Sequence, residues 1–558
     1  MNTEPLKTQL LFRNHKYRFK DTSGNECELR RNYLTPELMP GDIIHVDPKS
    51  AIAIAFVERN PQHAIAIVRG ISNQRIYFYC PLVSPFFNPS IAVTPDASHL
   101  QIGARVLLFI TKDTCEVKRI YAHISDRRAD KQIIDEFYAL SDFELPHQSN
   151  ALEPLYTKPF QNQNDLPTFT VDPTESRDFD DAITIVGNTV YVHIVDINQV
   201  MSQNSNLEKE AARLAFTLYT PEGNHNIVPA ECAEDAWSLV AGQERRVITI
   251  EIRYSKDNQY NIESYDIYPS TIIVKQRYDY EHAPPVEIAK ALAERTNRVV
   301  YSIPQLKLSI NPANGKVFEV KHMYSNDDAH RMIEIFMVTA NMIVSEHLRL
   351  KAPSYSNIPQ RFHTKLRGLP THPPTGDATV DSFLAIKTFA YAVYDPEKCG
   401  HYGLNLSSYT HFTSPIRRYF DVILHRMLAG VAYNPAELQT ILSHINAREA
   451  LITSLSHLYQ RWKLLDTMTV GDVIEVVITR VCAAGVYYLY KPYMLDGFIH
   501  VSALGGARWY YDTATNELIS HTNTTDSKNI KIGTCLKCRI TEVDVTKQLL
   551  AVSATTSM

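Results

Sequence analysis

The chain has 558 residues, of which 44% are hydrophobic, 10% aromatic and 21% charged, and its formal net charge is −5. This composition excludes disordered and collagen-like proteins, and at roughly one domain per 150 residues it predicts three or four folded domains. The small negative charge gives no global attraction to nucleic acid, so any such binding must depend on local patches.

The sequence predicts neither a membrane span nor a signal peptide. It has no run of about 20 apolar residues, and charges flank the short apolar stretch near its start. The eight cysteines are scattered, which is typical of reduced thiols in a cytoplasmic protein. Cys535 and Cys538 form a CxxC pair, but residues three apart on an expected strand point to opposite faces and no second pair exists, so zinc is not favoured.

Short apolar runs separated by turn residues fill the first part of the chain. They lie at 42–48, 51–59, 63–70, 74–83 and 104–113. These runs predict two small β-barrels, over residues 1–60 and 61–124. Within 11–20, three cations alternate with Tyr17 and Phe19, which suits either an ordinary half-buried strand or a groove for single-stranded nucleic acid. Residues 125–150 predict a helical linker.

The rest of the chain divides into a large body and a third barrel. From 151 to 465, expected strands mix with long helical stretches at 328–350, 378–393, 415–430 and 435–465. Residues 466–558 return to short strands and glycines. The expected fold is therefore multidomain α+β, with β-barrels around a mixed α/β body.

Four aspartates within ten residues form the most informative motif, and they are Asp172, Asp178, Asp180 and Asp181. Strands are expected at 168–171 and 182–186, and Gly187–Asn188 predicts a hairpin to a third strand, 189–196. In this register Asp196 lies alongside Phe179, and the aspartates gather at one end of the sheet.

Close, partly buried carboxylates repel one another, and a bound divalent cation removes that cost. Hard oxygen donors without an adjacent His or Cys favour Mg²⁺ or Mn²⁺ over Zn²⁺. A solvated acidic turn is the alternative, whereas the DxDxDG spacing of a calcium loop is absent.

A second dense motif lies at 407–428. Thr413 or Ser414, followed by Pro415, is typical of a helix start, and an apolar stripe follows. This pattern predicts that Arg417 and Arg418 lie in the first helical turn, where cations oppose the helix dipole. An anionic ligand such as a phosphate explains the arginine pair better. For Asp421 and His425, which share a face with Arg418, a structural network is favoured over direct catalysis. Ser414 is more simply a cap than a nucleophile, since no GxSxG elbow occurs.

Together these motifs resemble the ribonuclease II family, the exoribonucleases that share the RNB catalytic domain. The family's aspartate, short turn and DxDDA stand here as Asp172 and residues 178–182, and its HFTSPIRRYxD signature is present in full from His411 to Asp421. Residues 192–221 and 331–341 resemble two further family segments. The resemblance implies two cold-shock-like OB barrels (1–60 and 61–124), a helical linker (125–150), an RNB catalytic domain (151–465) and an S1-like RNA-binding OB barrel (466–558).

The resemblance also implies an activity: a processive 3′→5′ exoribonuclease that hydrolyses single-stranded RNA to nucleoside 5′-monophosphates by two-metal-ion catalysis, in RNA turnover. It implies that Asp172, Asp178, Asp180 and Asp181 hold Mg²⁺ or Mn²⁺, and that Asp180 is the residue most critical for cleavage. Arg417 would stabilise the charged transition state. The family suggests a monomer.

Further residues are implied to contact RNA. Tyr219 would stack near the 3′-terminal bases, Tyr280 would set product length and RNA preference, Glu334 would lie near the terminal ribose, and Arg418 would bind phosphate. In the last barrel, ring side chains lie on expected strands near Lys491, as an RNA-binding face or as barrel core, and they are Tyr487, Tyr488, Phe498 and His500.

Several positions depart from the family's pattern. Ile335 replaces the second of two adjacent acids, and SYSNIPQRFH (354–363) replaces a YRxHE-like stretch. An acidic–basic pair is missing from 446–462, and a second stacking aromatic is missing from 305–310. These changes bear on substrate grip and product length more than on the chemistry. The main alternative is a non-catalytic RNA-binding regulator on the same scaffold; a phosphorolytic nuclease or a DNA nuclease is a further one.

Overall fold

The computed structural model describes residues 6–9, 11–13, 16–20, 26–29, 42–47, 52–58, 62–82, 89–92, 97–111, 114–146, 150–151, 153–255, 260–284, 286–295, 301, 303–323, 328–351, 358–364, 374–505, 508–521 and 529–555. The chain splits into two compact units. The first unit comprises Met1–Phe137, Leu308–Val320 and Ser454–Met558, and the second unit comprises Tyr138–Lys307 and Lys321–Thr453.

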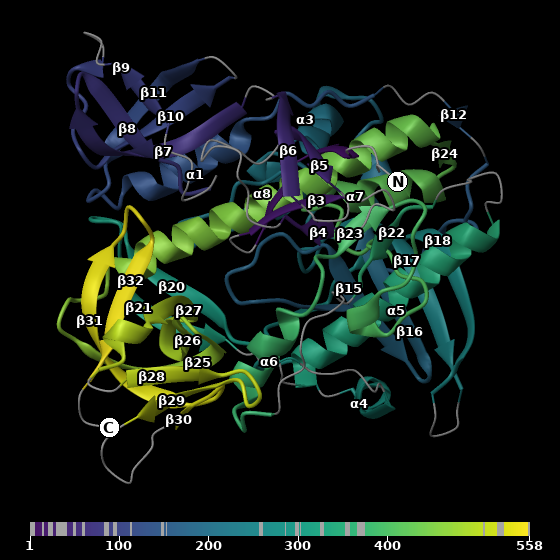
Figure 1. The fold of residues 1–558 in the computed structure, drawn as a ribbon. Coiled ribbons are helices and arrows are strands. Elements are labelled where there is room, and N and C mark those ends of the chain that lie inside the picture. The colour runs from purple at the N-terminus through teal and green to yellow at the C-terminus, as the bar shows by residue number, and fades with distance from the viewer. Residues whose placement is uncertain are drawn as a thin grey trace, which may run out of the picture. The chain divides into compact units, whose positions relative to one another are not determined.

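Short antiparallel strands form the N-terminal part of the first unit (Figure 1). One sheet contains β1 (Leu6–Gln9), β5 (Ile43–Asp47) and β6 (Ile52–Glu58), and another contains β2 (Leu11–Arg13), β3 (Lys16–Lys20) and β4 (Glu26–Glu28). Phe19 on β3 is buried, as in an ordinary half-buried strand. The side chains of the three cations on β3 lie outside what the structure describes, so the groove for nucleic acid stays a prediction.

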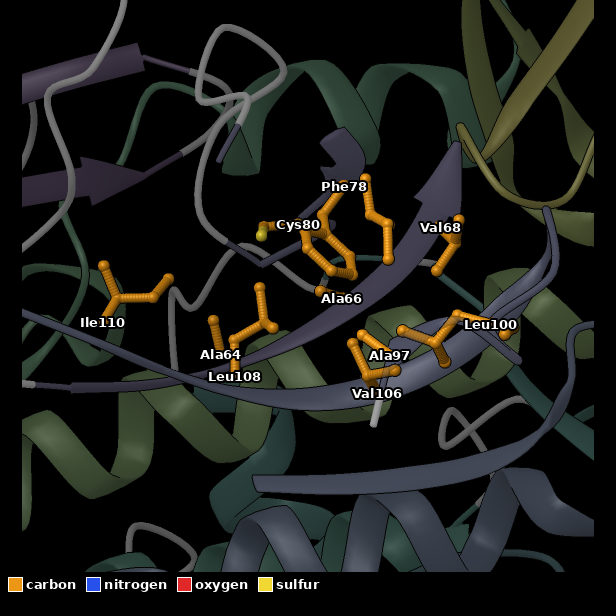
Figure 2. Packing of buried hydrophobic residues seen from close by; sticks show 12 residues of the cluster. Ala64, Ala66, Val68, Phe78, Cys80, Ala97, Leu100, Val106, Leu108 and Ile110 are labelled. Atoms are coloured by element: carbon orange, nitrogen blue, oxygen red, sulfur yellow. The ribbon is translucent and has the colours of Figure 1, made fainter. Parts of the chain in front are cut away.

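A five-stranded antiparallel sheet follows in the order β11-β10-β7-β8-β9. Its strands are β7 (Gln62–Ser72), β8 (Arg75–Tyr79), β9 (Ser90–Ala92), β10 (Ala104–Ile110) and β11 (Cys115–His123). Alternate residues of a strand point to the same face. The residues Ala64, Ala66 and Val68 of β7 therefore pack with Val106 and Leu108 of β10 in one buried cluster (Figure 2). Helix α1 (Ala129–Ala139) lies within the expected linker.

The C-terminal part of the first unit contains a second five-stranded sheet, in the order β27-β26-β25-β31-β32. Its strands are β25 (Val473–Cys482), β26 (Gly485–Tyr490), β27 (Leu495–His500), β31 (Cys535–Asp544) and β32 (Leu549–Ala554), with short 3₁₀ turns at Lys491–Tyr493 and Val501–Ala503. A separate small sheet contains β28 (Arg508–Asp512), β29 (Glu517–His521) and β30 (Asn529–Ile530). On β31, Cys535 is exposed and Cys538 is buried, which confirms that the CxxC pair faces both ways.

A seven-stranded sheet forms the framework of the second unit, in the order β13-β18-β17-β16-β15-β14-β19. Its strands are β13 (Gln161–Asn162), β14 (Phe169–Val171), β15 (Asp181–Val186), β16 (Thr189–Val195), β17 (Glu244–Tyr254), β18 (Ile262–Ile273) and β19 (Gln276–Tyr278). The predicted hairpin is confirmed, because Asp181 pairs with Ile194 and Ala182 with His193. Gly187 adopts φ +58° in the turn, a conformation that favours glycine.

A line of buried polar side chains crosses this sheet, one residue from each successive strand. Thr184 on β15 contacts His193 on β16 at 3.0 Å, and His193 contacts Thr249 on β17 at 2.8 Å. Thr249 then contacts Ser270 on β18 at 2.6 Å. Each group therefore finds a partner inside the protein. Burial lowers the pKa of His193 to about 3, so this imidazole is neutral at physiological pH.

The remaining helices lie between or after the strands of this sheet in the chain. They are α2 (Ile197–Val200), α3 (Asn206–Leu214), a π-helix (Cys232–Ala236), α4 (Glu287–Arg295), α5 (Asp328–Lys351), α6 (Ala378–Ile386), a 3₁₀ turn (Tyr402–Leu404), α7 (Tyr419–Leu428) and α8 (Pro435–Leu465). The expected helix at 378–393 is wrong beyond Ile386, because residues 393–395 form β23 (Val393–Asp395) and pair with β22 (Gln360–Phe362). Sheet pairing there overrides local helix propensity.

Two small two-stranded sheets complete the fold. One pairs β12 (Asn150–Ala151) with β24 (Val431–Ala432), and the other pairs β20 (Gln305–Asn311) with β21 (Lys316–Met323). Within the part of the chain that the structure describes, no helix has the length and hydrophobicity needed to cross a membrane.

Candidate active site

Residues 172–181, here called the acid loop, connect β14 to β15 and carry the four aspartates. At its start, the amide of Asp172 donates to the carbonyl of Tyr278 on β19 at 3.2 Å. At its end, the carbonyl of Asp180 accepts from the amide of Val195 on β16 at 3.1 Å, and Asp181 begins β15. Both ends of the acid loop are therefore fixed by the backbone of the seven-stranded sheet.

The arginine motif differs from its prediction in one respect. The chain turns at 415–417, within residues 414–418, here called the arginine turn. Helix α7 begins only at Tyr419, so Arg417 and Arg418 precede the helix instead of lying in its first turn. Arg418 is extended, with φ −136°, because its backbone forms a β-bridge with Phe216. The argument from the helix dipole therefore does not apply to these arginines.

Buried polar contacts hold the arginine turn in place. The Asp421 carboxylate accepts from the Ser414 amide at 2.7 Å and from the Arg418 guanidinium at 2.7 Å. His425 contacts the carbonyl of Phe412 through Nε2 at 3.0 Å. This is the structural network expected for Asp421 and His425. The network also engages the Arg418 guanidinium, whose buried Nε has no hydrogen-bond partner among the residues that the structure describes.

The acid loop and the arginine turn meet at Asp180, although 236 positions separate this residue from Ile416. The Ile416 amide donates to Asp180 Oδ1 at 2.8 Å, and Arg417 Nε donates to Oδ2 at 3.2 Å. Arg417 Nη2 also donates to Ser414 Oγ at 2.8 Å. The Asp180 side chain is 2% exposed, whereas that of Arg417 is 40% exposed. Arg417 is thus anchored by Asp180 and Ser414, while part of its side chain stays exposed.

Burial disfavours the charged forms of three carboxylates in the acid loop. Burial raises the pKa of Asp180 to about 8, although Arg417 and the Ile416 amide oppose the rise. Burial also raises the pKa of Asp172, and the charges of Asp181 and Asp180 raise it further. The pKa of Asp181 is raised by burial against the opposing charges of Arg417 and Arg418. The nearby arginines therefore neutralise this cluster only in part.

The donor chemistry of the acid loop fits a divalent cation. Four carboxylates with no His or Cys among them are the oxygen set that Mg²⁺ or Mn²⁺ prefers. Over the residues that the structure describes, no three His, Cys, Asp or Glu side chains already converge as a metal site. Asp178 and Asp180 accept hydrogen bonds from Tyr219 and Arg417, so their carboxylates would reorient to bind an ion through their remaining lone pairs while these contacts persist.

The structure brings Tyr219 to the acid loop. Its hydroxyl donates to Asp178 Oδ2 at 2.6 Å, while the residue is 45% exposed. Desolvation and the Asp178 charge raise the pKa of Tyr219, although Arg417 opposes them. The phenol therefore stays protonated, and its ring remains accessible beside the carboxylates.

Tyr280 and Glu334 are associated with helix α5 instead. The Tyr280 ring stacks on His330 with centroids 3.5 Å apart and an angle of 10° between the planes. Glu334 is exposed and lies one helical turn beyond His330, on the same side of α5. The roles assigned to these two residues stay predictions.

Sequence reasoning missed two residues that hold the acid loop. Ser238 Oγ donates to the Arg177 carbonyl at 2.6 Å and accepts from the Phe179 amide at 3.0 Å. Arg277 on β19 contacts the other half of the loop. Neither residue belongs to a sequence motif. Each contacts the backbone of the acid loop from more than 50 positions away in the chain, so no local pattern reveals the contact. Only the short π-helix before Ser238 is a local feature often found near functional sites.

The last five-stranded sheet, in the first unit, carries a row of exposed rings. Arg480, Tyr487 and Phe498 are cross-strand neighbours on β25, β26 and β27. The rings of Tyr487 and Phe498 lie 4.9 Å apart, and the Arg480 guanidinium lies 5.4 Å from the Tyr487 ring. Tyr488 is fully buried and belongs to the core. Tyr487 and Phe498 therefore belong to the exposed rings, and Tyr488 belongs to the barrel-like core of this sheet.

Comparison with known proteins places this geometry in a family. The family model described as the RNB domain matches residues 160–286 and 284–434. Ribonuclease R of Aquifex aeolicus is 25% identical over 449 residues, which cover 67% of this chain and 62% of that protein. Ribonuclease R of Escherichia coli is 24% identical over 471 residues, covering 70% and 57%. The match thus spans about three fifths of the length of these curated relatives.

Solved structures share the fold. RNase R of Mycoplasma genitalium, in complex with ribose-methylated single-stranded RNA, aligns with a TM-score of 0.75 and 18% identity over 99% of this chain and 100% of that one. Yeast Ssd1, a pseudonuclease, aligns with a TM-score of 0.70 and 14% identity over 93% and 81%. The RNB match contains both the acid loop and the arginine turn. The chain belongs to the ribonuclease II family, whose members share the RNB domain.

Proposed function

We propose that this chain is a processive 3′→5′ exoribonuclease that hydrolyses single-stranded RNA to nucleoside 5′-monophosphates, in RNA turnover in the cytoplasm. One observation carries the proposal: the Asp180 carboxylate of the acid loop accepts hydrogen bonds from Arg417 and from the Ile416 amide of the arginine turn, which is distant in sequence. This contact unites an acidic cluster suited to divalent cations with a cation suited to phosphate. The similarity to proteins named Ribonuclease R supports the same activity.

Asp172, Asp178, Asp180 and Asp181 would hold two Mg²⁺ or Mn²⁺ ions. Such ions, when bound, make a nucleophile from water at neutral pH and stabilise the leaving oxygen. The carboxylates supply four negative charges, which match the charge of two divalent cations. The raised pKa values of Asp172 and Asp180 have the same origin, since burial and repulsion by neighbouring aspartates disfavour the charged forms until cations are present.

Arg417 supplies positive charge at the scissile phosphate. Its contacts with Asp180 and Ser414 orient the guanidinium, and N–H groups of the fork that these contacts do not use can donate to phosphate oxygens. Because the group is oriented before the substrate arrives, it stabilises the extra charge of the transition state without reorganising. The exposed Tyr219 ring, tethered through its hydroxyl to Asp178, offers a stacking surface for a base next to that phosphate.

RNA binding extends beyond this site. The row of Arg480, Tyr487 and Phe498 offers stacking and a positive charge, which bind single strands with little sequence preference. In this proposal residues 1–60, 61–124 and 466–558 are OB barrels of the cold-shock and S1 types. Tyr280 sets product length and RNA preference, and Glu334 lies near the terminal ribose. The protein works as a monomer.

The direct test uses a 5′-labelled poly(A) strand with Mg²⁺. We expect a ladder of products that shortens from the 3′ end, with release of nucleoside 5′-monophosphates and arrest of the reaction by EDTA. Intact RNA, or products that form only with added phosphate, would contradict the proposal. A strand with a blocked 3′ end is the control, because an endonuclease would still cut it.

A second candidate function is RNA binding without cleavage. The observation that favours it is the similarity in fold to yeast Ssd1, a pseudonuclease, over 93% of this chain. Such a protein would bind poly(A) and leave it intact with either Mg²⁺ or Mn²⁺. The presence of all four aspartates and of Arg417 in contact with Asp180 favours the enzyme instead.

A further inference from the structure

We propose that Arg277 is a positioning residue that clamps the first half of the acid loop and thereby sets the affinity of the aspartates for divalent cations. The inference rests on the proposed function, because it concerns the metal site of that function. It assigns a role to a residue outside both motifs.

Arg277 stands beside the acid loop because of the sheet topology. It is the middle residue of β19, which lies at the edge of the seven-stranded sheet and pairs in parallel with β14. Thr170 is its partner across the two strands. The next pair along the strands joins Val171 to Tyr278, and the Asp172 amide then donates to the Tyr278 carbonyl. The backbone of β19 thus fixes the point at which the acid loop leaves β14.

The Arg277 side chain continues this hold along the loop. Its Nη2 donates to the carbonyl oxygens of Pro173 at 2.9 Å, Thr174 at 2.9 Å and Ser176 at 3.2 Å. Its guanidinium also lies 4.8 Å from the centre of the Phe179 ring. Three carbonyl dipoles of one turn therefore point at a single cationic group. A charged donor makes stronger hydrogen bonds than a neutral one.

Without Arg277 this half of the loop keeps few other contacts. The Ser176 amide closes a turn by donating to the Pro173 carbonyl at 3.0 Å. Lys307 pairs with Glu175, but both side chains are largely exposed, and such surface pairs contribute little. The second half of the loop is held separately by Ser238 and by the Leu239 amide, which donates to the Phe179 carbonyl at 3.0 Å. Arg277 is therefore the main side-chain restraint on residues 173–176 among the contacts that the structure shows.

The consequence follows from where the aspartates stand. Asp172 comes directly before the clamped turn, and Asp178 comes two residues after it. The Asp172 amide is tied to Tyr278, and Ser238 holds the residues on both sides of Asp178. A change in the turn therefore acts on how these two carboxylates are oriented relative to Asp180 and Asp181, whose positions are fixed by β15 and β16. Because the carboxylates must turn to converge on an ion, the backbone that carries them decides how readily they do so. Groups that orient metal ligands typically change metal affinity by roughly 10–100-fold when they are removed.

Matched variants separate the clamp from a simple effect of charge. Arg277→Gln removes the charge and the donor fork, and Arg277→Lys keeps the charge but replaces the fork with one nitrogen. Lys307→Gln removes a neighbouring positive charge that contacts only a side chain of the loop. Asp172→Asn is the reference for loss of a ligand.

The experiment measures Mn²⁺ binding to the full chain without RNA, by calorimetry and by the electron paramagnetic resonance signal of free Mn²⁺. We expect Arg277→Gln to weaken binding roughly tenfold or more and Arg277→Lys to fall between it and the wild type. Lys307→Gln should stay within about twofold of the wild type, since Lys307 contacts a side chain of the loop and not its backbone. Melting temperatures without metal check that each variant is folded, and the lysine variant serves if the glutamine variant is not.

Three results would overturn the inference. Mn²⁺ binding by Arg277→Gln that equals the wild type shows that the loop needs no clamp. Full recovery in Arg277→Lys, or equal losses in Arg277→Gln and Lys307→Gln, shows that charge alone acts. In the third result, the wild type binds no Mn²⁺, or Asp172→Asn binds it as well as the wild type does. This result contradicts both the proposed function and the inference, whereas the first two results leave the proposed function intact.

Discussion

Replacing Arg417 tests the contact on which the proposed chemistry depends. Its guanidinium is held by Asp180 at 3.2 Å through Nε and by Ser414 at 2.8 Å through Nη2, and 40% of the side chain stays exposed. Arg417→Lys keeps the charge, but a single ammonium cannot hold both partners and also face a phosphate with a planar fork. Arg417→Met keeps only the apolar stem.

The expected size of the effect follows from this geometry. Loss of one preorganised donor to a transition state slows catalysis by roughly 10²–10³-fold, or about 3–4 kcal/mol. We therefore expect the single-turnover rate to fall by roughly 10²-fold in Arg417→Lys and by roughly 10³-fold in Arg417→Met. RNA affinity should change less, because many phosphate and base contacts share it. Asp180 retains the hydrogen bond from the Ile416 amide, so the fold should persist in both variants.

The assay is rapid-quench cleavage of 5′-labelled poly(A) with enzyme in excess and saturating Mg²⁺. RNA affinity is measured separately by fluorescence anisotropy in EDTA. Arg253→Met is the matched control, because Arg253 is half exposed at the opposite end of the same sheet and pairs with Glu251. A cleavage rate for Arg417→Met within about threefold of the wild type, where roughly 10³-fold is expected, would refute the role of this arginine.

Three further changes probe the site and its support. Asp180→Asn should abolish cleavage but retain RNA binding in the anisotropy assay, because it keeps the shape of the side chain and removes a charge needed for metal; normal cleavage would disprove the assignment. Glu208→Ala leaves the buried Arg426 without its carboxylate and should lower the free energy of unfolding in urea by about 3–5 kcal/mol, whereas Glu210→Ala, at an exposed pair on the same helix, should cost less than about 1 kcal/mol. Similar losses in the two variants would contradict this reading. His193 has a pKa of about 3 in the fold against 6.5 otherwise, so below pH 6.5 the unfolded chain binds a proton that the folded chain does not, and stability falls with acid. Between pH 6.5 and 4.5 the wild type should lose about 2 kcal/mol more than His193→Gln, and parallel pH curves would rule the effect out.

Local patterns were sufficient for the hairpin that carries the aspartates. Alternation of apolar residues on both sides of Gly187–Asn188 sets the strands and the register, because a two-residue turn leaves one pairing that keeps both apolar faces buried. The same logic predicts that Cys535 and Cys538 on β31 point to opposite faces, and the structure shows that Cys538 is the buried one. Where a segment makes its own contacts, its sequence predicts its structure.

The start of α7 shows where this logic stops. Ser414 and Pro415 are typical of a helix start, yet the helix begins at Tyr419. The Asp421 carboxylate binds the Ser414 amide, and Arg418 is extended against Phe216, a residue of a distant segment. These tertiary contacts outweigh a local preference of about 1 kcal/mol for a capped start.

The sequence by itself determined the chemistry that the site offers: four carboxylates without His or Cys, and an arginine turn suited to phosphate. Only the tertiary structure decided how these groups are held. Asp180 meets Arg417, Asp178 meets Tyr219, and Arg277 reaches the turn at 173–176, through contacts between segments far apart in the chain. Residue types and short-range spacing are properties of the sequence, whereas these contacts depend on how the seven-stranded sheet and the segments around it pack together.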